Sequence, residues 1–449
     1  MIDTSFLQGR TVAVMGLGKS GTATVNALRL GGAEVWAWDD DEAARAAAAA
    51  AGVPIVDLAA ADFCRLAALV WSPGVPHRFP RPHPVAEKAR AAGIEPVCDI
   101  DLLARALPDA HLLAISGTNG KSTTTTLLAH VEAAAGREVA AGGNLGIPAL
   151  ALTAPGPDGR IVLELSSYQL ELVPSLRLDA AALLNITPDH LGRHGGMDGY
   201  IAAKRRMFDR LKPGGTAVVG IDDDSSAAIA DSLGGVVRIS AVRRLERGIS
   251  APEGILLDDG RPVRDLKTIA RLPGRHNWQN ACAVFALARA DGIDADVIAA
   301  ALATYPGLAH RQELVGVVDG VAWVNDSKAT NADATEKALV CYDRVLWIAG
   351  GQAKEGGITA LEPHFGRITH AFLIGEAAAA FAETLAGKVA FSRCGSLDVA
   401  VAAAHAMAKP GDTVLLSPAS ASWDQFTSFE HRGEVFRALV AGLGQGRAA

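Results

Sequence analysis

An apolar run, HLLAI, leads directly into SGTNGKSTTTT (residues 116–126), and a stretch with helical spacing of apolar residues follows. A strand, a glycine-containing loop and a helix in this order are typical of nucleotide-binding α/β folds. The general phosphate-binding loop is G-x-x-x-x-G-K-[ST]. Gly120, Lys121 and Ser122 match its end, but Ile115 stands where its first glycine belongs. The segment predicts a nucleotide site of a different subtype, the alternative being a polar helix start that contains a lysine.

The chemistry of this loop favours a nucleotide triphosphate with Mg²⁺. The glycines permit a turn whose N–H groups point inward, Lys121 adds a cation for the β- and γ-phosphates, and the Ser122 hydroxyl is placed to bind Mg²⁺. The predicted ATP-binding residues of the loop are Gly117, Thr118, Asn119, Gly120, Lys121, Ser122 and Thr123.

Further candidates follow later apolar runs of the same segment. Glu164 ends the run RIVLE and is a candidate Mg²⁺ ligand; the alternative, a helix cap, suits Ser166 and Ser167 better. Asp189 and His190 are expected to end the next strand, where His190 is either a site residue or a structural histidine. Lys204, in YIAAKRRMF, reads from its neighbours as a basic residue on a solvated helix face.

The N-terminal segment contains a second glycine loop. An apolar run at residues 11–15 leads into GLGKSG (residues 16–21), a helical stretch and a second strand that ends at Asp39. This G-x-G-x-x-G arrangement predicts a diphosphate at a helix N-terminus. Two alternatives are glycines that serve packing only, and an NAD-dependent dehydrogenase. Further on, LVWSPGVP (residues 69–76) predicts a strand that runs into a ligand-binding loop.

The strand–helix alternation recurs in the last third of the chain, in GVAWVN, RVLWIAGG, HAFLIGEA and DTVLLSPAS, so we predict three α/β units in tandem with mostly parallel sheets. A formal charge of −7 argues against a nucleic-acid partner. Five scattered cysteines without a C-x-x-C pair, no basic and apolar leader, and no long uncharged apolar stretch predict a cytoplasmic protein without a membrane span.

Taken together, the motifs GTNGKST, GGNLG, LELSSYQL, NITPDHL, YIAAK, PGRHNWQNA, HRQE, NDSKATN and SPASASWDQF occur in the order found in the Mur ligases, and the chain resembles that family over nearly its whole length. The shortened loop is the family's own form. The resemblance implies three domains: a Rossmann-like UDP-substrate-binding domain (1–99), a central ATP-binding domain with a P-loop ATPase-like parallel sheet (100–307) and a Rossmann-like amino-acid-binding domain (308–449).

The resemblance also implies an activity. The expected reaction is ATP-dependent amide ligation in peptidoglycan biosynthesis, in which D-glutamate is joined to UDP-N-acetylmuramoyl-L-alanine through an acyl phosphate by a monomer that binds two Mg²⁺ ions. Alternatives are a ligase of the same architecture that adds another amino acid such as L-glutamate, a folate ligase, which lacks a separate UDP-binding domain, and a non-catalytic nucleotide-binding scaffold.

Carried over by motif, the resemblance assigns the remaining site residues. The ATP nucleoside and phosphates are expected to contact Asn277, Asn280, Arg311 and Asp326. The UDP substrate is expected to contact Gly18, Lys19, Ser20, Asp39, Gly74 and Asn144. The D-glutamate is expected to contact Thr330, Lys354, Ser422 and Phe429. The metal ions are expected to be bound by Ser122, Glu164, His190 and Lys204. Lys204 is expected to bind as a carbamate, and this role contradicts the interpretation that it lies on a solvated helix face. The catalytic groups are Lys121, His190, Lys204, Arg311 and Lys354.

One position departs from the family pattern. Relatives commonly carry DHLDRH or a similar string, and here Gly192 replaces the second aspartate. If that aspartate orients the histidine or a metal-bound water, either activity is reduced in this chain or a neighbouring residue takes its place.

Overall fold

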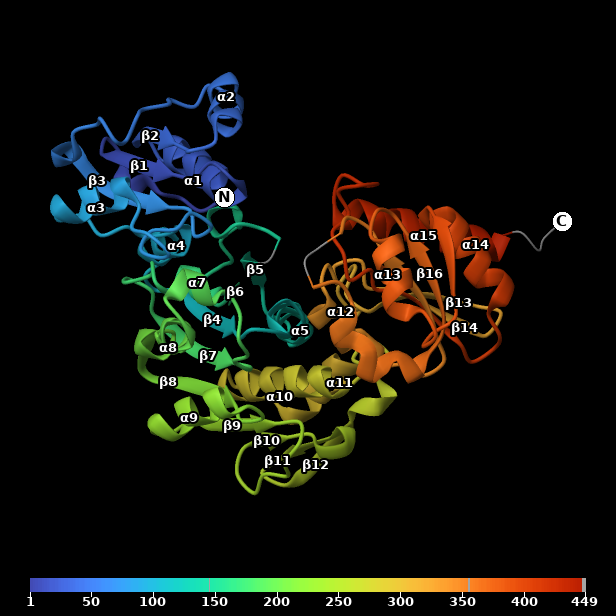
Figure 1. Cartoon of the computed structure of the whole chain (residues 1–449). Helices are drawn as coiled ribbons and strands as arrows, with labels where there is room; N and C mark the ends of the chain where they lie inside the picture. The colour runs from blue at the N-terminus through green and yellow to red at the C-terminus, as the bar shows by residue number, and fades with distance from the viewer. Residues whose placement is uncertain (145, 354–355, 446–449) are drawn as a thin grey trace. The chain divides into compact units, whose positions relative to one another are not determined.

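The computed structural model describes residues 1–144, 146–353 and 356–445 of the 449-residue chain. Its named strands form three separate sheets (Figure 1). The chain divides into two compact units, Met1–Leu266 with Asn277–Tyr305, and Lys267–His276 with Pro306–Ala449. The first unit contains two of the sheets, so the predicted boundary between residues 99 and 100 falls inside it. The division into three domains stays a prediction.

The first sheet is parallel, with the order β2-β1-β3. Its strands are β1 (Thr11–Met15), β2 (Glu34–Trp38) and β3 (Leu66–Trp71), and the nearby helices are α1 (Lys19–Leu30), α2 (Glu42–Ala50), α3 (Pro84–Ala91) and α4 (Asp99–Ala106). All five residues of β1 are buried, as expected for a central parallel strand covered on both faces. Gly21 is required where α1 passes the glycine loop, because a Cβ there would collide with the carbonyl oxygen of Gly16.

The second sheet has nine strands in the order β12-β11-β10-β9-β8-β7-β4-β6-β5. They are β4 (His111–Ser116), β5 (Val139–Gly143), β6 (Arg160–Glu164), β7 (Leu178–Leu183), β8 (Leu211–Gly220), β9 (Val237–Ser240), β10 (Ile249–Ser250), β11 (Ile255–Asp258) and β12 (Arg261–Asp265). The helices of this segment are α5 (Lys121–Ala134), α6 (Ser167–Leu170), α7 (Leu191–His194), α8 (Met197–Arg205), α9 (Asp224–Ser232), α10 (Arg275–Ala290) and α11 (Ala295–Ala303). Strands β4 to β10 are parallel to their neighbours, and β11 and β12 add an antiparallel extension that the sequence did not predict.

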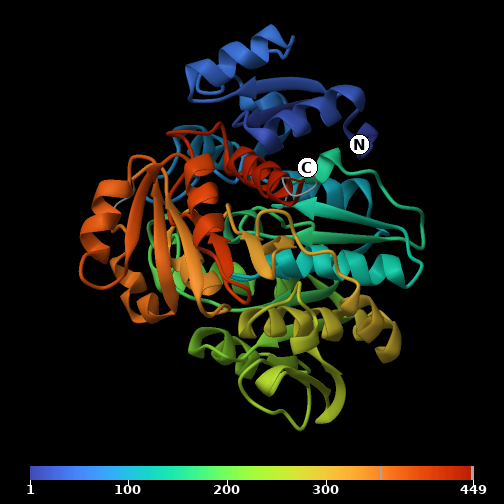
Figure 2. The ribbon, with the colours of Figure 1, turned by 90° about the vertical axis from the view of Figure 1, so that its right-hand side faces the viewer.

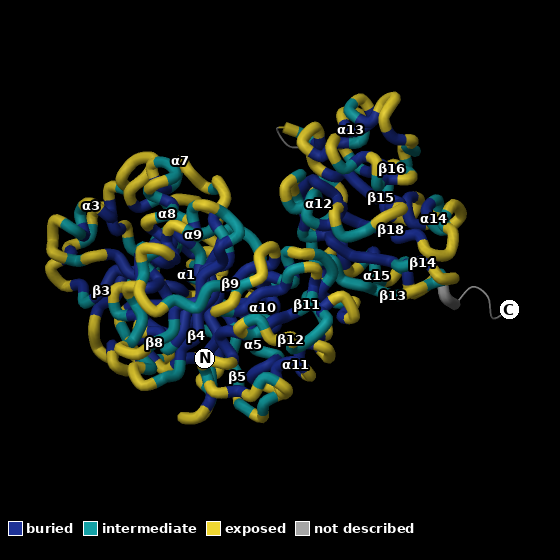
Figure 3. Tube along the Cα trace, turned by 90° about the horizontal axis from the view of Figure 1, so that it is seen from below, coloured by how far each residue is buried: buried dark blue, intermediate teal, exposed yellow. Residues whose placement is uncertain are grey.

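The order of the central strands places the site. Strand β4, buried along most of its length (Figure 3), lies between β6 and β7 and runs parallel to both. The glycine loop after β4, Glu164 at the end of β6 and the segment after β7 therefore meet at one carboxyl edge, where ligands bind in open parallel sheets.

The third sheet has the order β13-β14-β18-β15-β16-β17, and all its pairs are parallel except β13 with β14. Its strands are β13 (Glu313–Val318), β14 (Val321–Asn325), β15 (Val345–Gly350), β16 (Ile368–Ile374), β17 (Phe391–Gly395) and β18 (Thr413–Leu416). Helices α12 (Ala332–Leu339) and α13 (Ala378–Leu385) pack with Trp347 on one face. Helices α14 (Leu397–Met407) and α15 (Phe429–Gln445) pack with Trp323 on the other (Figure 2).

The predicted fold class, α/β with three mostly parallel sheets, is confirmed. Among the described residues, none of the helices combines the length and apolar character needed to cross a membrane.

Candidate functional site

The glycine loop after β4 has the geometry of a phosphate-binding turn. Gly120 adopts φ 84° and immediately precedes α5, whose first residue is Lys121. An added Cβ at Gly120 would collide with Oδ1 of Asn280, so only glycine fits. The loop backbone is fixed by Asn185, whose carbonyl oxygen accepts from Thr118 N at 2.9 Å and whose Oδ1 accepts from Asn119 N at 2.9 Å. The first turn of α5 therefore meets a rigid loop at the sheet edge.

Lys121 lies folded over its own loop. Its Nζ donates to the carbonyl oxygens of Gly117 at 3.0 Å and Thr118 at 2.8 Å. Ser122, the next residue, is buried in the first turn of α5. A cation and a hydroxyl thus lie side by side at the start of the helix, as the sequence predicted for the phosphate and Mg²⁺ contacts.

Glu164 has an uncompensated carboxylate oxygen. The residue ends β6 and is 2 % exposed; Oε1 accepts from Asn144 Nδ2 at 2.8 Å, whereas Oε2 is buried without a hydrogen-bond partner. A buried charged oxygen without a partner is costly, and a bound cation removes that cost. The alternative helix-capping role is taken by Ser166, which forms a capping box with Gln169 at the start of α6. The donor set therefore fits a divalent cation.

Lys204 contradicts the interpretation that it lies on a solvated helix face. The residue is on α8 and is 1 % exposed, and its Nζ donates to the carbonyl oxygen of Gly117 at 2.8 Å. Burial, reinforced by the nearby charge of Lys121, lowers its pKa well below the usual lysine value, while Asp189 and Glu164 oppose that shift. The structure thus gathers Lys121, Glu164 and Asp189 around Lys204.

His190 lies outside strand β7, contrary to the expectation that it ends the strand. Strand β7 stops at Leu183, and His190 adopts φ 52° immediately before the short helix α7. Its Nε2 lies 3.3 Å from Oδ2 of Asp189, and both side chains are about half exposed. Gly192, the departure from the family pattern, is exposed, and a Cβ added there would meet nothing within 4 Å. Among the described residues, no three His, Cys, Asp or Glu side chains are grouped to hold a metal ion.

The predicted UDP-substrate residues other than Asn144 lie at the carboxyl edge of the first sheet, and Asn144 follows β5 of the second sheet. Asp39 supports the glycine loop, because its Oδ2 accepts from Leu17 N at 2.6 Å. Gly18 and Lys19 are exposed at the start of α1, and Gly74 is exposed in the loop after β3. Asn144 is exposed apart from its contact with Glu164, which joins the predicted muramoyl contact to the predicted metal ligand.

Two loops of the third sheet are tied together by Arg432, a residue that the sequence did not indicate. Its guanidinium is fully buried; Nη2 donates to Ser327 O at 2.8 Å and to Ser420 O at 3.2 Å, and Nε donates to Ser327 Oγ at 2.9 Å. The predicted D-glutamate residues Thr330 and Ser422 follow these two loops, and Phe429 begins α15. Lys354 lies outside the described residues.

The predicted ATP residues are divided between the two units. Asn280 donates through Nδ2 to Asn277 Oδ1 at 3.1 Å within α10, and Asn280 also borders Gly120. Asp326, in the second unit with Arg311, is buried and accepts from Ser417 Oγ at 2.8 Å and from Gln312 N at 3.1 Å. Burial raises its pKa to about 7 against the lowering effect of these hydrogen bonds.

Comparison with known proteins identifies this arrangement. Residues 115–288 match the Mur ligase middle domain, and residues 310–420 match the Mur ligase glutamate ligase domain. The UDP-N-acetylmuramoylalanine–D-glutamate ligase of Paramagnetospirillum magneticum is 66 % identical over 100 % of both chains. The chain belongs to the Mur ligase family. The enzyme of the same name from Rhodospirillum rubrum is 58 % identical over 98 % of this Mur ligase and 96 % of the relative.

Solved structures show the same fold at low identity. The UDP-N-acetylmuramate–alanine ligase MurC of Thermotoga maritima matches 96 % of this Mur ligase and 99 % of its own chain, with a TM-score of 0.60 and 16 % identity. MurF of Acinetobacter baumannii matches 99 % of this Mur ligase and 92 % of its own chain, with a TM-score of 0.58 and 20 % identity.

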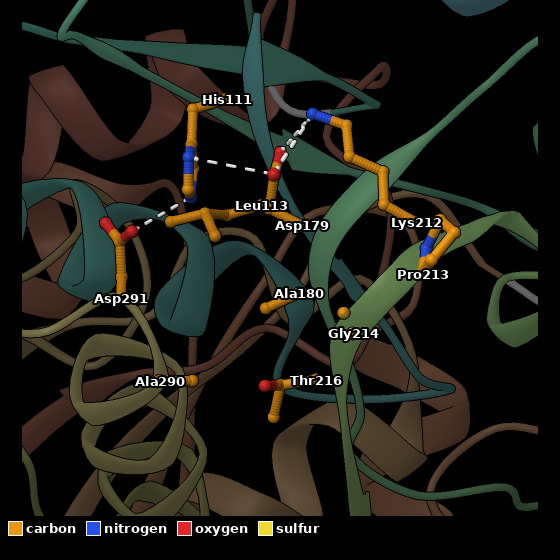
Figure 4. A pocket seen from close by; sticks show the side chains of 11 residues that line it. His111, Leu113, Asp179, Ala180, Lys212, Pro213, Gly214, Thr216, Ala290 and Asp291 are labelled. Carbon is orange, nitrogen blue, oxygen red and sulfur yellow. Dashed lines mark hydrogen bonds and ion pairs between the residues drawn. The ribbon is translucent and has the colours of Figure 1, made fainter.

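A cavity of about 250 Å³ lies at the opposite edge of the middle sheet, away from the glycine loop of this Mur ligase. It is lined at the beginnings of β4, β7 and β8 by His111, Asp179 and Lys212 (Figure 4). Asp179 accepts from Lys212 Nζ at 2.9 Å, and His111 Nε2 lies 2.9 Å from Asp291 Oδ1. The polar side chains that line this cavity are thus paired with one another.

Proposed function

We propose that this Mur ligase uses ATP to join D-glutamate to UDP-N-acetylmuramoyl-L-alanine, with release of ADP and phosphate, in peptidoglycan biosynthesis. One observation carries the proposal: Lys121, Glu164 and Lys204 converge on the glycine loop. They do so in a chain that is 66 % identical over its whole length to an enzyme named UDP-N-acetylmuramoylalanine–D-glutamate ligase.

The glycine loop supplies the phosphoryl-donor half of the reaction. The carboxylate of UDP-N-acetylmuramoyl-L-alanine is a poor electrophile and must first be activated. Its oxygen attacks the γ-phosphorus of ATP, the bond from that phosphorus to the bridging oxygen breaks, and ADP leaves. The amine of D-glutamate then attacks the carbonyl carbon of the acyl phosphate, the bond from that carbon to the phosphate oxygen breaks, and the nitrogen loses a proton as phosphate leaves. The loop N–H groups and Lys121 hold the phosphates, and Lys121 exchanges the carbonyls of Gly117 and Thr118 for phosphate oxygens.

Ser122 and Glu164 are proposed to hold one Mg²⁺ ion, and His190 with a carbamylated Lys204 the other. The unpartnered Oε2 of Glu164 supports the first assignment. The lowered pKa of Lys204 supports the second, because only a neutral amine attacks CO₂. The neutral amine forms an N–C bond to CO₂ with loss of one proton, which converts the side chain into an anionic carbamate ligand. Bound Mg²⁺ neutralises the charge of the phosphates and the carboxylate.

The remaining assignments place each substrate on its own domain. We assign the UDP part of the substrate to Gly18, Lys19, Ser20, Asp39 and Gly74, and the muramoyl part to Asn144. We assign the nucleoside and phosphates of ATP to Asn277, Asn280, Asp326 and Arg311. We assign D-glutamate to Thr330, Lys354, Ser422 and Phe429. The exposed loops after β1 and β3 and the two loops fixed by Arg432 support these assignments.

A phosphate-release assay tests the proposal. Purified protein supplied with Mg²⁺ and bicarbonate is expected to release phosphate only when ATP, UDP-N-acetylmuramoyl-L-alanine and D-glutamate are all present. Reactions that omit one substrate each are the controls, and L-glutamate replaces D-glutamate in a parallel series. Turnover with L-glutamate alone would replace the D-specific assignment, and no turnover with either would contradict the proposal.

A further inference from the structure

Residues 189–196 of the middle segment pack directly on residues 72–79 of the N-terminal segment, within the same compact unit. Arg193 donates through Nη2 to the carbonyl oxygens of Pro73 at 2.9 Å and Val75 at 2.8 Å. Gly195, at φ 73°, lies against Phe79 so closely that an added Cβ would come within 3.1 Å of its ring. The first stretch carries His190 and the second carries Gly74, so the proposed second-metal and UDP-substrate segments are in contact.

Glu171 bonds both stretches at once. Its Oε2 lies 2.9 Å from Nε2 of His77, and its Oε1 lies 3.1 Å from Nδ1 of His194. His77 and His194 are 2 % and 4 % exposed, so neither imidazole has water as a substitute partner. Burial raises the pKa of Glu171, but the hydrogen bonds of His194 and His77 outweigh it and lower that pKa to about 2.

The hydrogen bonds to Arg90 and to Glu171 determine which ring nitrogens of His77 and His194 carry a proton toward Glu171. Arg90 Nη2 lies 2.9 Å from His77 Nδ1, and a guanidinium has only donors, so His77 accepts there and donates from Nε2 to Glu171. Ser167 Oγ lies 2.9 Å from His194 Nε2. With Glu171 ionised, His194 donates from Nδ1 to Oε1 of Glu171. The order Ser–His–carboxylate matches that of hydrolytic triads, but Ser167 is only 3 % exposed, so the network is a support and not a nucleophile.

Tyr168 extends the network to the proposed metal ligand. Its ring stacks on His194 at 5.4 Å between centroids and lies 5.1 Å from the ring of His190. The guanidinium of Arg193 sits 4.6 Å above the same ring. A change at Glu171 therefore reaches His190 through His194 and Tyr168, and reaches the loop of Gly74 through His77.

We propose that Glu171, through His77 and His194, is a positioning residue that couples the UDP-substrate loop to the segment bearing His190, so that binding of the nucleotide sugar and of Mg²⁺ favour each other. The inference rests on the site assignments proposed above. None of Glu171, His77 and His194 is assigned a contact with substrate, so the effect is a coupling between two sites.

The experiment measures binding by calorimetry, without turnover. Affinity for UDP-N-acetylmuramoyl-L-alanine is measured with and without Mg²⁺ and a non-hydrolysable ATP analogue, in wild type, Glu171→Gln and Glu171→Asp. We expect Mg²⁺ to tighten sugar-nucleotide binding about fivefold or more in wild type, and this enhancement to be lost in Glu171→Gln and partly kept in Glu171→Asp. Activity assays should show a Mg²⁺ requirement raised about tenfold, with the KM for D-glutamate unchanged.

The matched control is Asp179→Asn, which removes a half-buried carboxylate paired with Lys212 at the opposite edge of the second sheet and should leave the enhancement intact.

His190→Ala and Lys19→Ala test the underlying assignments; if neither alters Mg²⁺ or sugar-nucleotide binding, the proposed sites themselves fail. If they do alter binding while Glu171→Gln keeps the enhancement, the coupling is wrong. If Glu171→Gln does not fold, the Mg²⁺ enhancement is measured in His77→Gln, in His194→Gln and in the double variant. If the effects of the two single variants multiply in the double variant, the two histidines act independently and the coupling is wrong.

Discussion

Lys204 Nζ donates to the carbonyl oxygen of Gly117 at 2.8 Å, so a buried lysine from helix α8 holds the backbone of the phosphate-binding loop. Lys121 donates to the same oxygen at 3.0 Å. Burial of Lys204 and the nearby charge of Lys121 both lower the pKa of Lys204 and so favour its neutral form. If the carbamate proposed for Lys204 forms, it changes a contact that holds the loop.

The carbamate can be tested by cavity rescue. Lys204→Ala is expected to lower kcat about 100-fold or more, because an anionic metal ligand is lost. Acetate or propionate, which fit the space left by the side chain, should restore part of the rate. Lys204→Met, which fills that space, is the matched control and should not respond. Equal responses of both variants to added acid would contradict a carbamate at this position.

Gly120→Ala is expected to weaken ATP binding. The residue combines φ 84° with a close approach of Asn280, so a methyl group strains the loop by roughly 1–3 kcal/mol. Gly136→Ala is the matched control, because Gly136 shares φ 84° but an added Cβ there meets nothing within 4 Å. Fluorescence titration with an ATP analogue should show weaker binding for Gly120→Ala alone, and equal losses would assign the effect to backbone strain in general.

The buried carboxyl of Asp326 predicts a pH-dependent stability. Its folded-state pKa of about 7 lies above the unfolded value near 3.9, so the folded state binds more protons between these limits. Its contribution to the unfolding free energy is full below about pH 4 and is lost as pH rises through about 7, by up to roughly 4 kcal/mol. Denaturant titrations from pH 5 to 8 should show this decline in wild type and a smaller one in Asp326→Asn; parallel curves would contradict it.

Gly192→Asp tests whether a neighbour replaces the missing family aspartate. The position is exposed and an added Cβ meets nothing within 4 Å, so stability should change by no more than about 0.5 kcal/mol. Asp189 lies 3.3 Å from His190 and is the neighbour in question. Asp189→Asn is expected to raise the Mg²⁺ concentration for half-maximal activity, and Gly192→Asp to offset that rise in the double variant. No offset would show that the two carboxylates are not interchangeable.

Local patterns in the sequence were sufficient for the parallel core. The apolar runs before GTNGKS and after it predicted β4 and β6, and hence Glu164 beside the loop. The local patterns did not predict the burial of a side chain where that burial depends on which face of a helix packs against the protein. Lys204 and Arg205 are adjacent basic residues of α8, yet only Lys204 is fully buried. The resemblance to the family corrected that assignment, which periodicity in a nine-residue helix does not.

Long-range contacts account for most of what was missed. His77 and Glu171 are 94 residues apart in the chain, and Arg432 and Ser327 are 105 apart, so no spacing rule joins them. The antiparallel strands β11 and β12 were missed because the short runs ILLD and RPVRD lack the long apolar core of the parallel strands.

The contacts of Arg432 bear on selection between the two enantiomers of glutamate. The two enantiomers of glutamate carry identical groups and differ only in their arrangement around one carbon, so selection between them demands contacts that do not drift. By bonding the carbonyls of Ser327 and Ser420 from the interior, Arg432 prevents the two neighbouring loops from shifting independently. If D-glutamate binds beside these loops as proposed, the buried guanidinium favours selection of one enantiomer, because it limits how far the pocket adapts to the other.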